Sequence, residues 1–176
     1  MADIAKLIRT IPHYPKEGIM FRDITTLLKD PQGFKETIDL LIAKYKDSRF
    51  DYIAGIEARG FILGSALAYA LGKGFIPVRK KGKLPGKTVT QSYNLEYGSD
   101  TIEIHDDAIE AGSRVLLIDD LIATGGTAIG AITLIEKVGG VIFETAFVVD
   151  LPELGGAKKI QDLGHKVFAL CEFSGH

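Results

Sequence analysis

The 176-residue sequence lacks the features that mark several common classes of protein. It contains one cysteine, Cys171, which excludes an internal disulfide and favours a reducing compartment. No stretch approaches the roughly 18 consecutive apolar residues of a membrane-spanning helix, and residues 1–20 carry charges where a signal peptide has a continuous apolar core. We therefore expect a cytoplasmic protein that does not enter a membrane.

A strong excess of either charge is also missing. The formal net charge is −2 and the isoelectric point is about 6.1, so no broad basic surface is expected and nucleic acid is not an expected partner. Any anion-binding site must therefore be local. The four histidines show no spacing typical of paired metal ligands; they are His13, His105, His165 and His176.

Strand-like and helix-like segments alternate along most of the chain, and its 46% apolar residues suffice for one domain, residues 1–176, with a substantial core. This alternation predicts an α/β fold in which a parallel β-sheet is flanked by helices on both faces. Strands are expected at 52–56, 75–78, 115–118, 141–149 and 166–170, and helices at 31–45, 60–71 and 129–138.

The first thirty or so residues differ from this pattern. Apolar residues at helical spacing predict a short helix over Ala2–Thr10. Residues 13–26 are too irregular for a central strand and too apolar for a solvated loop, so we expect them to line a site. Together, residues 1 to about 30 are predicted to form a small cap on the domain.

The most informative stretch is residues 115–127, VLLIDDLIATGGT. Its unbroken apolar start is typical of a strand buried on both faces, and ligands bind at the carboxyl end of such strands. Asp119 and Asp120 follow, where they can accept hydrogen bonds from sugar hydroxyls. The next residues offer glycines, hydroxyls and helix N–H groups, which together suit a phosphate; they are Ala123, Thr124, Gly125, Gly126 and Thr127.

A purely structural interpretation of this stretch is also available. In it, Asp119 ends a strand, Asp120 or Thr124 caps the following helix, and the glycines only form a tight turn. However, two adjacent carboxylates at the end of a buried strand are costly to keep without partners, which favours a functional site. A phosphorylated sugar would satisfy the acids and the turn together.

Residues 115–127 resemble the phosphoribosyl pyrophosphate (PRPP) motif of the type I phosphoribosyltransferase family. They lack the closing Gly-Lys-Ser/Thr of a Walker A loop and the Gly-x-Gly-x-x-Gly of a dinucleotide-binding turn. The resemblance implies a Rossmann-like parallel sheet flanked by helices, with a small N-terminal hood (about residues 1–30) and a flexible lid (about residues 79–100).

Two cationic segments extend the resemblance. Residues 57–61, EARGF, end a predicted strand, and in the family this turn contacts pyrophosphate, often with a non-proline cis peptide, which implies that role for Arg59. Residues 79–86, RKKGKLPG, resemble the family's lid and imply that Lys83, Arg79 and Lys80 also bind pyrophosphate. From the residues alone, Arg59 could equally pair with an acid, and the lid cations with solvent.

Two further segments resemble the members of the family that use adenine: residues 18–23, GIMFRD, and 92–98, SYNLEYG. The first implies that Phe21 stacks on the base while main-chain groups of Met20 and Arg22 read its edge. The second implies that Glu96 exchanges a proton with the base, supported by Tyr97. Without the resemblance, Phe21 would be a core residue and Glu96 a surface acid.

The reaction implied by the resemblance joins adenine and PRPP to give AMP and pyrophosphate in purine salvage, with Arg59 and Glu96 as catalytic residues. It further implies Mg²⁺ as cofactor, held mainly through PRPP rather than by protein ligands, and a homodimer. Two alternatives stay open. One is a phosphoribosyltransferase for a 6-oxopurine or a pyrimidine; the other is a PRPP-sensing regulator, for which the sequence shows neither a helix-turn-helix nor a basic face.

Overall fold

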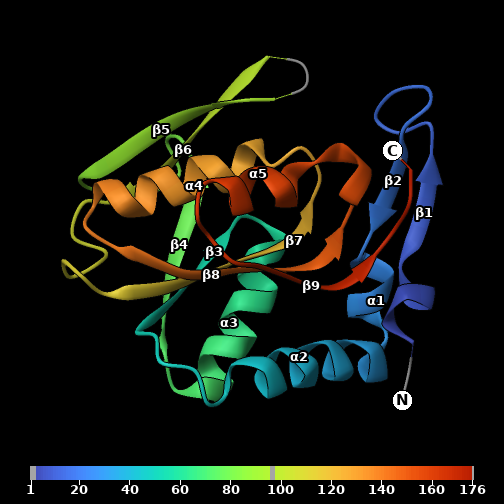
Figure 1. Cartoon of the computed structure of the whole chain (residues 1–176), viewed down its shortest axis with the longest axis horizontal. Helices are drawn as coiled ribbons and strands as arrows, with labels where there is room; N and C mark the ends of the chain where they lie inside the picture. Colours follow the sequence, from blue (N-terminus) through green and yellow to red (C-terminus); the bar gives the residue numbers. More distant parts are fainter. Residues whose placement is uncertain (1–2, 96–97, 176) are drawn as a thin grey trace.

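The computed structural model describes residues 3–95 and 98–175. Within them, seven strands form one sheet in the order β5-β6-β4-β3-β7-β8-β9, and two more form a separate hairpin (Figure 1). The strands of the large sheet are β3 (Tyr52–Ile56), β4 (Gly74–Lys80), β5 (Thr88–Asn94), β6 (Ser99–His105), β7 (Arg114–Ile122), β8 (Val141–Asp150) and β9 (Val167–Glu172).

The middle of the large sheet is parallel, with β7 between β3 and β8. Successive residues of β7 enter opposite cores: Val115 and Leu117 pack on one face of the sheet, and Leu116 and Ile118 on the other. All four are at most 1% exposed. The predicted α/β class, with a parallel sheet covered on both faces, is therefore confirmed.

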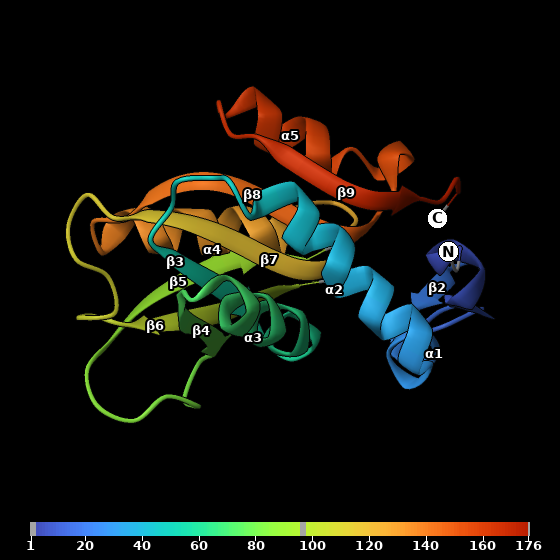
Figure 2. The same cartoon turned by 90° about the horizontal axis from the view of Figure 1, so that it is seen from below.

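Helices cover the two faces of the sheet (Figures 1 and 2). α2 (Pro31–Tyr45) and α3 (Arg59–Leu71) contribute to the core on one face, and α4 (Gly126–Lys137) and α5 (Gly156–Asp162) to the core on the other. No helix in residues 3–95 or 98–175 combines the length and apolar character needed to cross a membrane.

Local signals in the sequence define the ends of α2 and α3. The Asp30 carboxylate accepts a hydrogen bond from the N–H of Gly33 at 2.7 Å, and Pro31 occupies the first helical position. Gly72 ends α3 with a left-handed φ of 67°. The observed helices agree with the predicted helices at 31–45 and 60–71 to within one residue.

The antiparallel hairpin β5–β6 extends the sheet beyond β4. In the described part of the sheet β6 pairs with β4 only through Arg79 and Lys80, whereas Pro77 pairs on the other side with Gly55 of β3. Pro77 therefore sits in an interior strand but faces no ladder partner on the β6 side. The missing N–H of proline therefore costs little there, although proline is usually confined to strand ends and edges.

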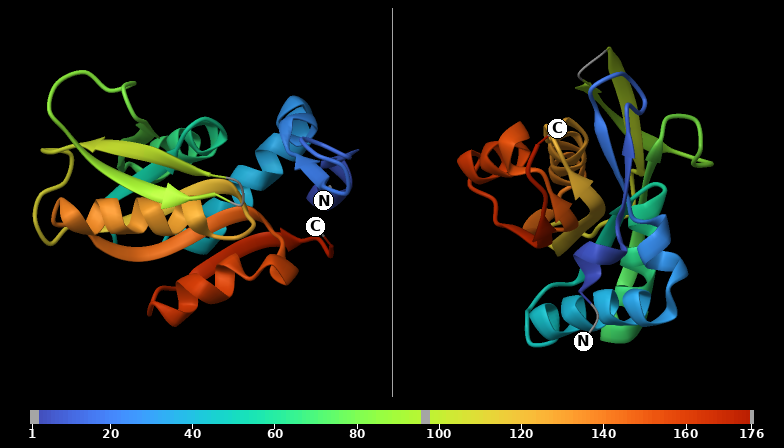
Figure 3. Two further views of the ribbon diagram at one scale, coloured as in Figure 1. Left: turned by 90° about the horizontal axis from the view of Figure 1, so that it is seen from above. Right: turned by 90° about the vertical axis from the view of Figure 1, so that its right-hand side faces the viewer.

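The N-terminal region forms a hairpin rather than the predicted helix. The helix over Ala2–Thr10 is wrong except for a single 3₁₀ turn, because Arg9 and its successors pair with a second strand, and these ladder bonds outweigh helix propensity. The hairpin lies at the end of the large sheet where β8 and β9 finish (Figures 1 and 3). The elements are η1 (Ile4–Leu7), β1 (Arg9–Pro12), β2 (Met20–Asp23) and α1 (Thr25–Lys29).

Candidate functional site

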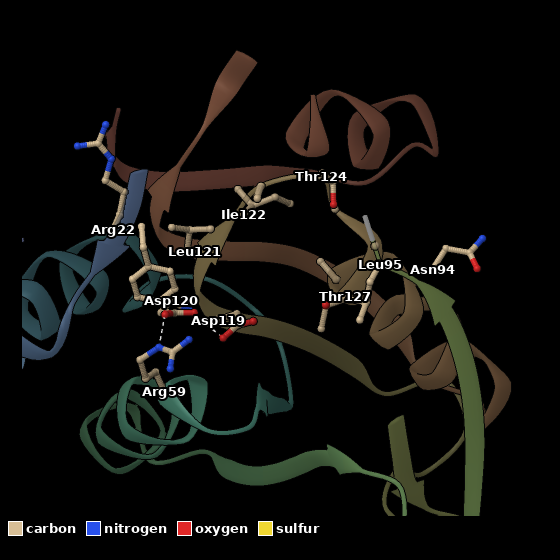
Figure 4. Close-up of a pocket in the computed structure, with 15 residues that line it drawn as sticks. Arg22, Arg59, Asn94, Leu95, Asp119, Asp120, Leu121, Ile122, Thr124 and Thr127 are labelled. Carbon is tan, nitrogen blue, oxygen red and sulfur yellow. Dashed lines mark hydrogen bonds and ion pairs between the residues drawn. The ribbon is translucent and has the colours of Figure 1, made fainter. Parts of the chain in front are cut away.

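A cavity of about 230 Å³ opens at the carboxyl end of β7 (Figure 4). Segments that are far apart in the sequence converge on it, including the β1–β2 hairpin, the start of α3, the end of β5 and the turn into α4. The structure thus brings together residues of the predicted hood, an arginine, and the stretch that contains the two acids and the turn. From the sequence, these residues were expected to form one site. The lining residues are Phe21, Arg22, Arg59, Asn94, Leu95 and residues 119–128.

Two acids and one arginine meet at the end of β7. Asp120 is 6% exposed, and its Oδ2 forms an ion pair with Nε of Arg59, the first residue of α3 (Figure 4). Asp119 Oδ1 accepts a hydrogen bond from the N–H of Asp120 at 2.9 Å. Burial, reinforced by the charge of Asp120, raises the pKa of Asp119 well above its ordinary value. Asp120 thus pairs with the cation, Asp119 accepts one backbone N–H, and both can accept further donors.

The turn after these acids is shaped by Gly125, which has a left-handed φ of 89° and precedes the first residue of α4. No side chain among the described residues caps α4 at this point, so the interpretation of Asp120 or Thr124 as its cap is wrong. The first N–H groups of the helix have no partner inside the helix and lie at the cavity wall. This arrangement suits an anion.

Two residues of α5 donate hydrogen bonds to the backbone of the turn, a contact that the sequence analysis did not predict. Gly156 donates its N–H to the carbonyl oxygen of Ala123 at 3.0 Å, and Lys159 Nζ donates to that of Thr124 at 3.1 Å. A Cβ placed on Gly125 would lie 3.0 Å from the Gly156 Cα, so the two backbones can approach only because both residues are glycine. The partners lie some thirty residues downstream of the turn, and no local signal indicates them.

A second cavity of about 220 Å³ adjoins the acids on the side of β4 and β6. Within it, Lys80 Nζ forms an ion pair with Asp100 Oδ2 at 2.8 Å, and the Tyr93 hydroxyl donates to the same oxygen at 3.4 Å. Tyr93 and Asp100, like Glu57, were not predicted as site residues. Its polar lining consists of Glu57, Arg59, Lys80, Tyr93, Asp100, Asp119, Asp120 and Thr127.

The other predicted lid cations are placed differently. Arg79 Nε lies 3.4 Å from Glu57 Oε1, and its guanidinium stacks over the ring of Phe61. Lys83 lines neither of these two cavities as described. The loop that carries Lys83 is attached at its base, where the N–H of Leu84 donates to Glu103 Oε1 at 2.8 Å.

The residues predicted to bind the base also differ in their position relative to the cavity. Phe21 lines the first cavity and meets the ring of Tyr14 edge-on, with centroids 5.3 Å apart. Met20 is 39% exposed and does not line the cavity, and the guanidinium of Arg22 points away from Asp119 and Asp120 (Figure 4). The β1–β2 hairpin therefore contributes the aromatic ring of Phe21 and part of Arg22 to the cavity wall.

Two predicted residues, Glu96 and Tyr97, lie outside the described residues. Their neighbours Asn94 and Leu95 line the first cavity. The peptide bond between Glu57 and Ala58 is cis, a feature that the resemblance implied for this turn.

A divalent cation would find only part of a coordination shell here. Within residues 3–95 and 98–175 no group of three or more His, Cys, Asp or Glu side chains is arranged to hold a metal ion. Asp119 and Asp120 supply carboxylate oxygens, which suit Mg²⁺, but Asp120 already pairs with Arg59. The donor set fits Mg²⁺ best when most of its oxygens come from a bound diphosphate.

Comparison with known proteins agrees with this geometry. A model of the phosphoribosyl transferase domain matches residues 23–169, which include β7, the acids and the turn. The chain belongs to the phosphoribosyltransferase family.

Similar proteins narrow the identification. The adenine phosphoribosyltransferase of Chlorobium luteolum is 66% identical over 174 residues, which cover 98% of each chain. The crystal structure of adenine phosphoribosyltransferase from Thermoanaerobacter pseudethanolicus has a TM-score of 0.92 and 48% identity, covering 97% of this chain and 98% of that one. The Saccharomyces cerevisiae enzyme, solved with an imino-altritol bisphosphate and adenine, has a TM-score of 0.87 and 41% identity over 97% of this chain and 100% of that one. Within its family, the chain belongs to the adenine phosphoribosyltransferases.

Proposed function

We propose that this protein transfers the 5-phosphoribosyl group of PRPP to adenine and releases AMP and pyrophosphate, a reaction of purine salvage. The observation that carries the proposal is the anion-binding turn directly after Asp119 and Asp120, in a cavity that Phe21 also lines. The 66% identity to an adenine phosphoribosyltransferase supports the choice of adenine over other bases.

The sugar-phosphate half of PRPP would occupy the end of β7. Asp119 and Asp120 would accept hydrogen bonds from the 2- and 3-hydroxyls of the ribose, which gives partners to two adjacent carboxylates of which only Asp120 pairs with Arg59 in the described residues. The 5-phosphate would accept hydrogen bonds from the backbone N–H groups and hydroxyls of the turn. That turn consists of Ala123, Thr124, Gly125, Gly126 and Thr127.

The pyrophosphate half would enter the second cavity. Arg59 and Lys80 would exchange their internal partners, Asp120 and Asp100, for pyrophosphate oxygens, and the planar guanidinium can bind two of them at once. We also propose that the lid, residues 79–100, closes over the substrate and adds the positive charge of Arg79 and Lys83.

Charge separation in the transition state gives these groups their catalytic value. As the bond to pyrophosphate breaks, C1 of the ribose becomes positive and the leaving group negative, so cations placed beforehand at the pyrophosphate stabilise the transition state. We propose Mg²⁺ as the cofactor, held mainly by PRPP, where it would neutralise part of the diphosphate charge. Arg59 is the described residue best placed to act on the leaving group.

Adenine would bind between the hairpin and the ribose. Phe21 would stack on the purine, and the main chain of Met20 and Arg22 would read its edge, accepting from the amine and donating to the ring nitrogen. A 6-oxopurine exchanges that donor and acceptor and would leave polar groups unpaired. Glu96 would exchange a proton with the imidazole ring, and Tyr97 would support it.

We further propose that the protein acts as a single-domain subunit of a homodimer in the cytoplasm. The exposed face of α3 supports the dimer, because Tyr69 is 91% exposed and Ile62 42% exposed on the same helix. A cytoplasmic location suits the reaction, since PRPP and AMP are multiply charged and do not cross membranes unaided.

A panel of bases tests the proposed function. The purified protein with PRPP and Mg²⁺ should convert adenine to AMP, and should give little product with hypoxanthine, guanine or orotate. Removal of Mg²⁺ with a chelator should abolish the reaction. Product from another base but not from adenine would refute the assigned specificity, and binding of PRPP without any product would favour a regulator.

A further inference from the structure

The chain ends beside the hairpin formed by β1 and β2 (Figure 1). β9 finishes at Glu172, and the N–H of Phe173 then donates to the carbonyl oxygen of Asp150, the last residue of β8, at 3.1 Å. Residues 173–175, the C-terminal segment, therefore leave the large sheet at its carboxyl edge. The hairpin that they approach precedes them by about 150 positions.

Arg22 connects the hairpin to this segment. Its Nη2 donates to the carbonyl oxygen of Ser174 at 3.2 Å, and its guanidinium carbon lies 4.6 Å from the centroid of the Phe173 ring. Its Nη1 donates to Thr10 Oγ1 on β1 at 2.6 Å. One guanidinium thus joins both strands of the hairpin to the end of the chain.

The hairpin needs such an attachment because it is a separate two-stranded sheet and shares no ladder with the large one in the described residues. An isolated two-stranded hairpin is only marginally stable in water, so contacts of its side chains must set its position. Arg22 Nε is buried without a described hydrogen-bond partner. The ring and the two hydrogen bonds therefore determine where the guanidinium lies.

The position of Arg22 determines the position of Phe21. Both residues line the cavity, but the Arg22 guanidinium points away from Asp119 and Asp120 (Figure 4) and toward Phe173 and Ser174. Because the two residues are adjacent on β2, a displacement of the backbone at Arg22 would also displace Phe21. A change at the end of the chain is thereby transmitted to the aromatic surface above the acids.

We infer that Phe173 and Ser174 hold the β1–β2 hairpin in place over the cavity, with Arg22 as a positioning residue, and so set the affinity for the base. This inference rests on the proposed function, because it takes adenine as the ligand that Phe21 contacts. It gives the C-terminal segment a role in recognition of the base and none in recognition of PRPP, whose turn is held by α4 and α5 instead.

Three variants of the full-length protein test the inference. Phe173→Leu keeps an apolar side chain but removes the aromatic face under Arg22, and should raise KM for adenine about three- to tenfold at saturating PRPP. Phe173→Tyr keeps the face and should restore the wild-type value. KM for PRPP and kcat should stay within about twofold of wild type in both, since the turn and the acids are untouched.

A control contact involves β9 itself. Lys44 Nζ, on α2, sits 5.0 Å from the centroid of the Phe168 ring on β9, a cation–ring contact of the same kind that includes no residue of β1 or β2. Lys44→Gln should leave KM for adenine unchanged. A similar rise in this variant would overturn the inference, because it would show a general effect of loosening β9.

Two further outcomes would also overturn the inference. One is an unchanged KM for adenine in Phe173→Leu, and the other is an equal rise of both KM values, which indicates general loosening of the site. Failure of the proposed function looks different, because the wild-type protein itself would then form no AMP from adenine. The base panel and the variant series therefore distinguish failure of the proposed function from failure of the inference about the C-terminal segment.

Discussion

The phosphate turn and the base-binding hairpin are built in opposite ways. The turn joins a largely buried strand to a helix within thirteen consecutive residues, and α5 donates hydrogen bonds to its backbone. The β1–β2 hairpin is a separate two-stranded sheet, and Asp23 is the buried residue of β2. Arg22 connects this hairpin to the C-terminal segment. If the two regions bind as proposed, binding of the sugar phosphate is a property of the core, whereas binding of the base depends on long-range contacts at the surface.

The two acids offer the strongest test of this contrast. Replacing Asp119 and Asp120 together with Asn should lower kcat/KM for PRPP about 100-fold or more, because two charge-assisted hydrogen bonds to the ribose are lost. Adenine binding should change less than about threefold, as measured by fluorescence or calorimetry. As a control, Asp162→Asn removes an acid from an exposed helical ion pair and should change neither. An equal loss of both affinities would contradict the separation of the two regions.

The glycine of the turn gives the next largest effect. Gly125→Ala forces a Cβ into a left-handed backbone and against Gly156, whereas Gly164 has the same φ of 89° with nothing within 4 Å of its Cβ position. Gly164→Ala should lower the free energy of unfolding by about 1–2 kcal/mol from backbone conformation alone. Gly125→Ala should lower it further and raise KM for PRPP about tenfold, because the N–H groups of the turn are displaced. Equal behaviour of the two variants in thermal unfolding and kinetics would contradict the importance of the close approach.

Glu103 tests how firmly the lid region is attached. Although burial works in the opposite direction, N–H groups of Leu84, Gly82 and Lys83 keep its pKa below the ordinary value of 4.5. A carboxyl whose pKa is lowered in the folded state stabilises the fold at pH values above its ordinary pKa. This stabilisation is lost as the pH falls through the lowered pKa. Glu103→Gln should therefore lower Tm by about 3 °C above pH 5, and the difference from wild type should shrink below about pH 4. A difference independent of pH would rule out this role of the charge.

The smallest effect is expected at the pyrophosphate side, where Asp100 competes for Lys80. Asp100→Asn should release Lys80 and tighten product inhibition by pyrophosphate about three- to fivefold, a modest change because more than half of the Lys80 side chain is exposed. Asp162→Asn, which breaks the exposed pair with Lys158, is again the matched control. Unchanged or weaker inhibition in Asp100→Asn would show that Asp100 does not compete with the product.

Local patterns were sufficient for much of the core. Tyr52–Ile56 forms the strand predicted for 52–56, and the helices predicted at 31–45 and 60–71 are present, because periodicity, caps and turn glycines act between near neighbours. The predicted helix over Ala2–Thr10 failed for the complementary reason. Its residues pair with a strand more than ten positions away, and no local pattern encodes that ladder.

The sequence by itself determined the fold class and the family, since these depend on contiguous residues and on a motif of thirteen positions. Only the tertiary structure decided which partners the charged groups take: Arg59 with Asp120, Lys80 with Asp100, and Arg22 with the end of the chain. It also decided that α5 supports the turn. These contacts join residues 20 to more than 150 positions apart, and their geometry exists only once the sheet has brought its edges together.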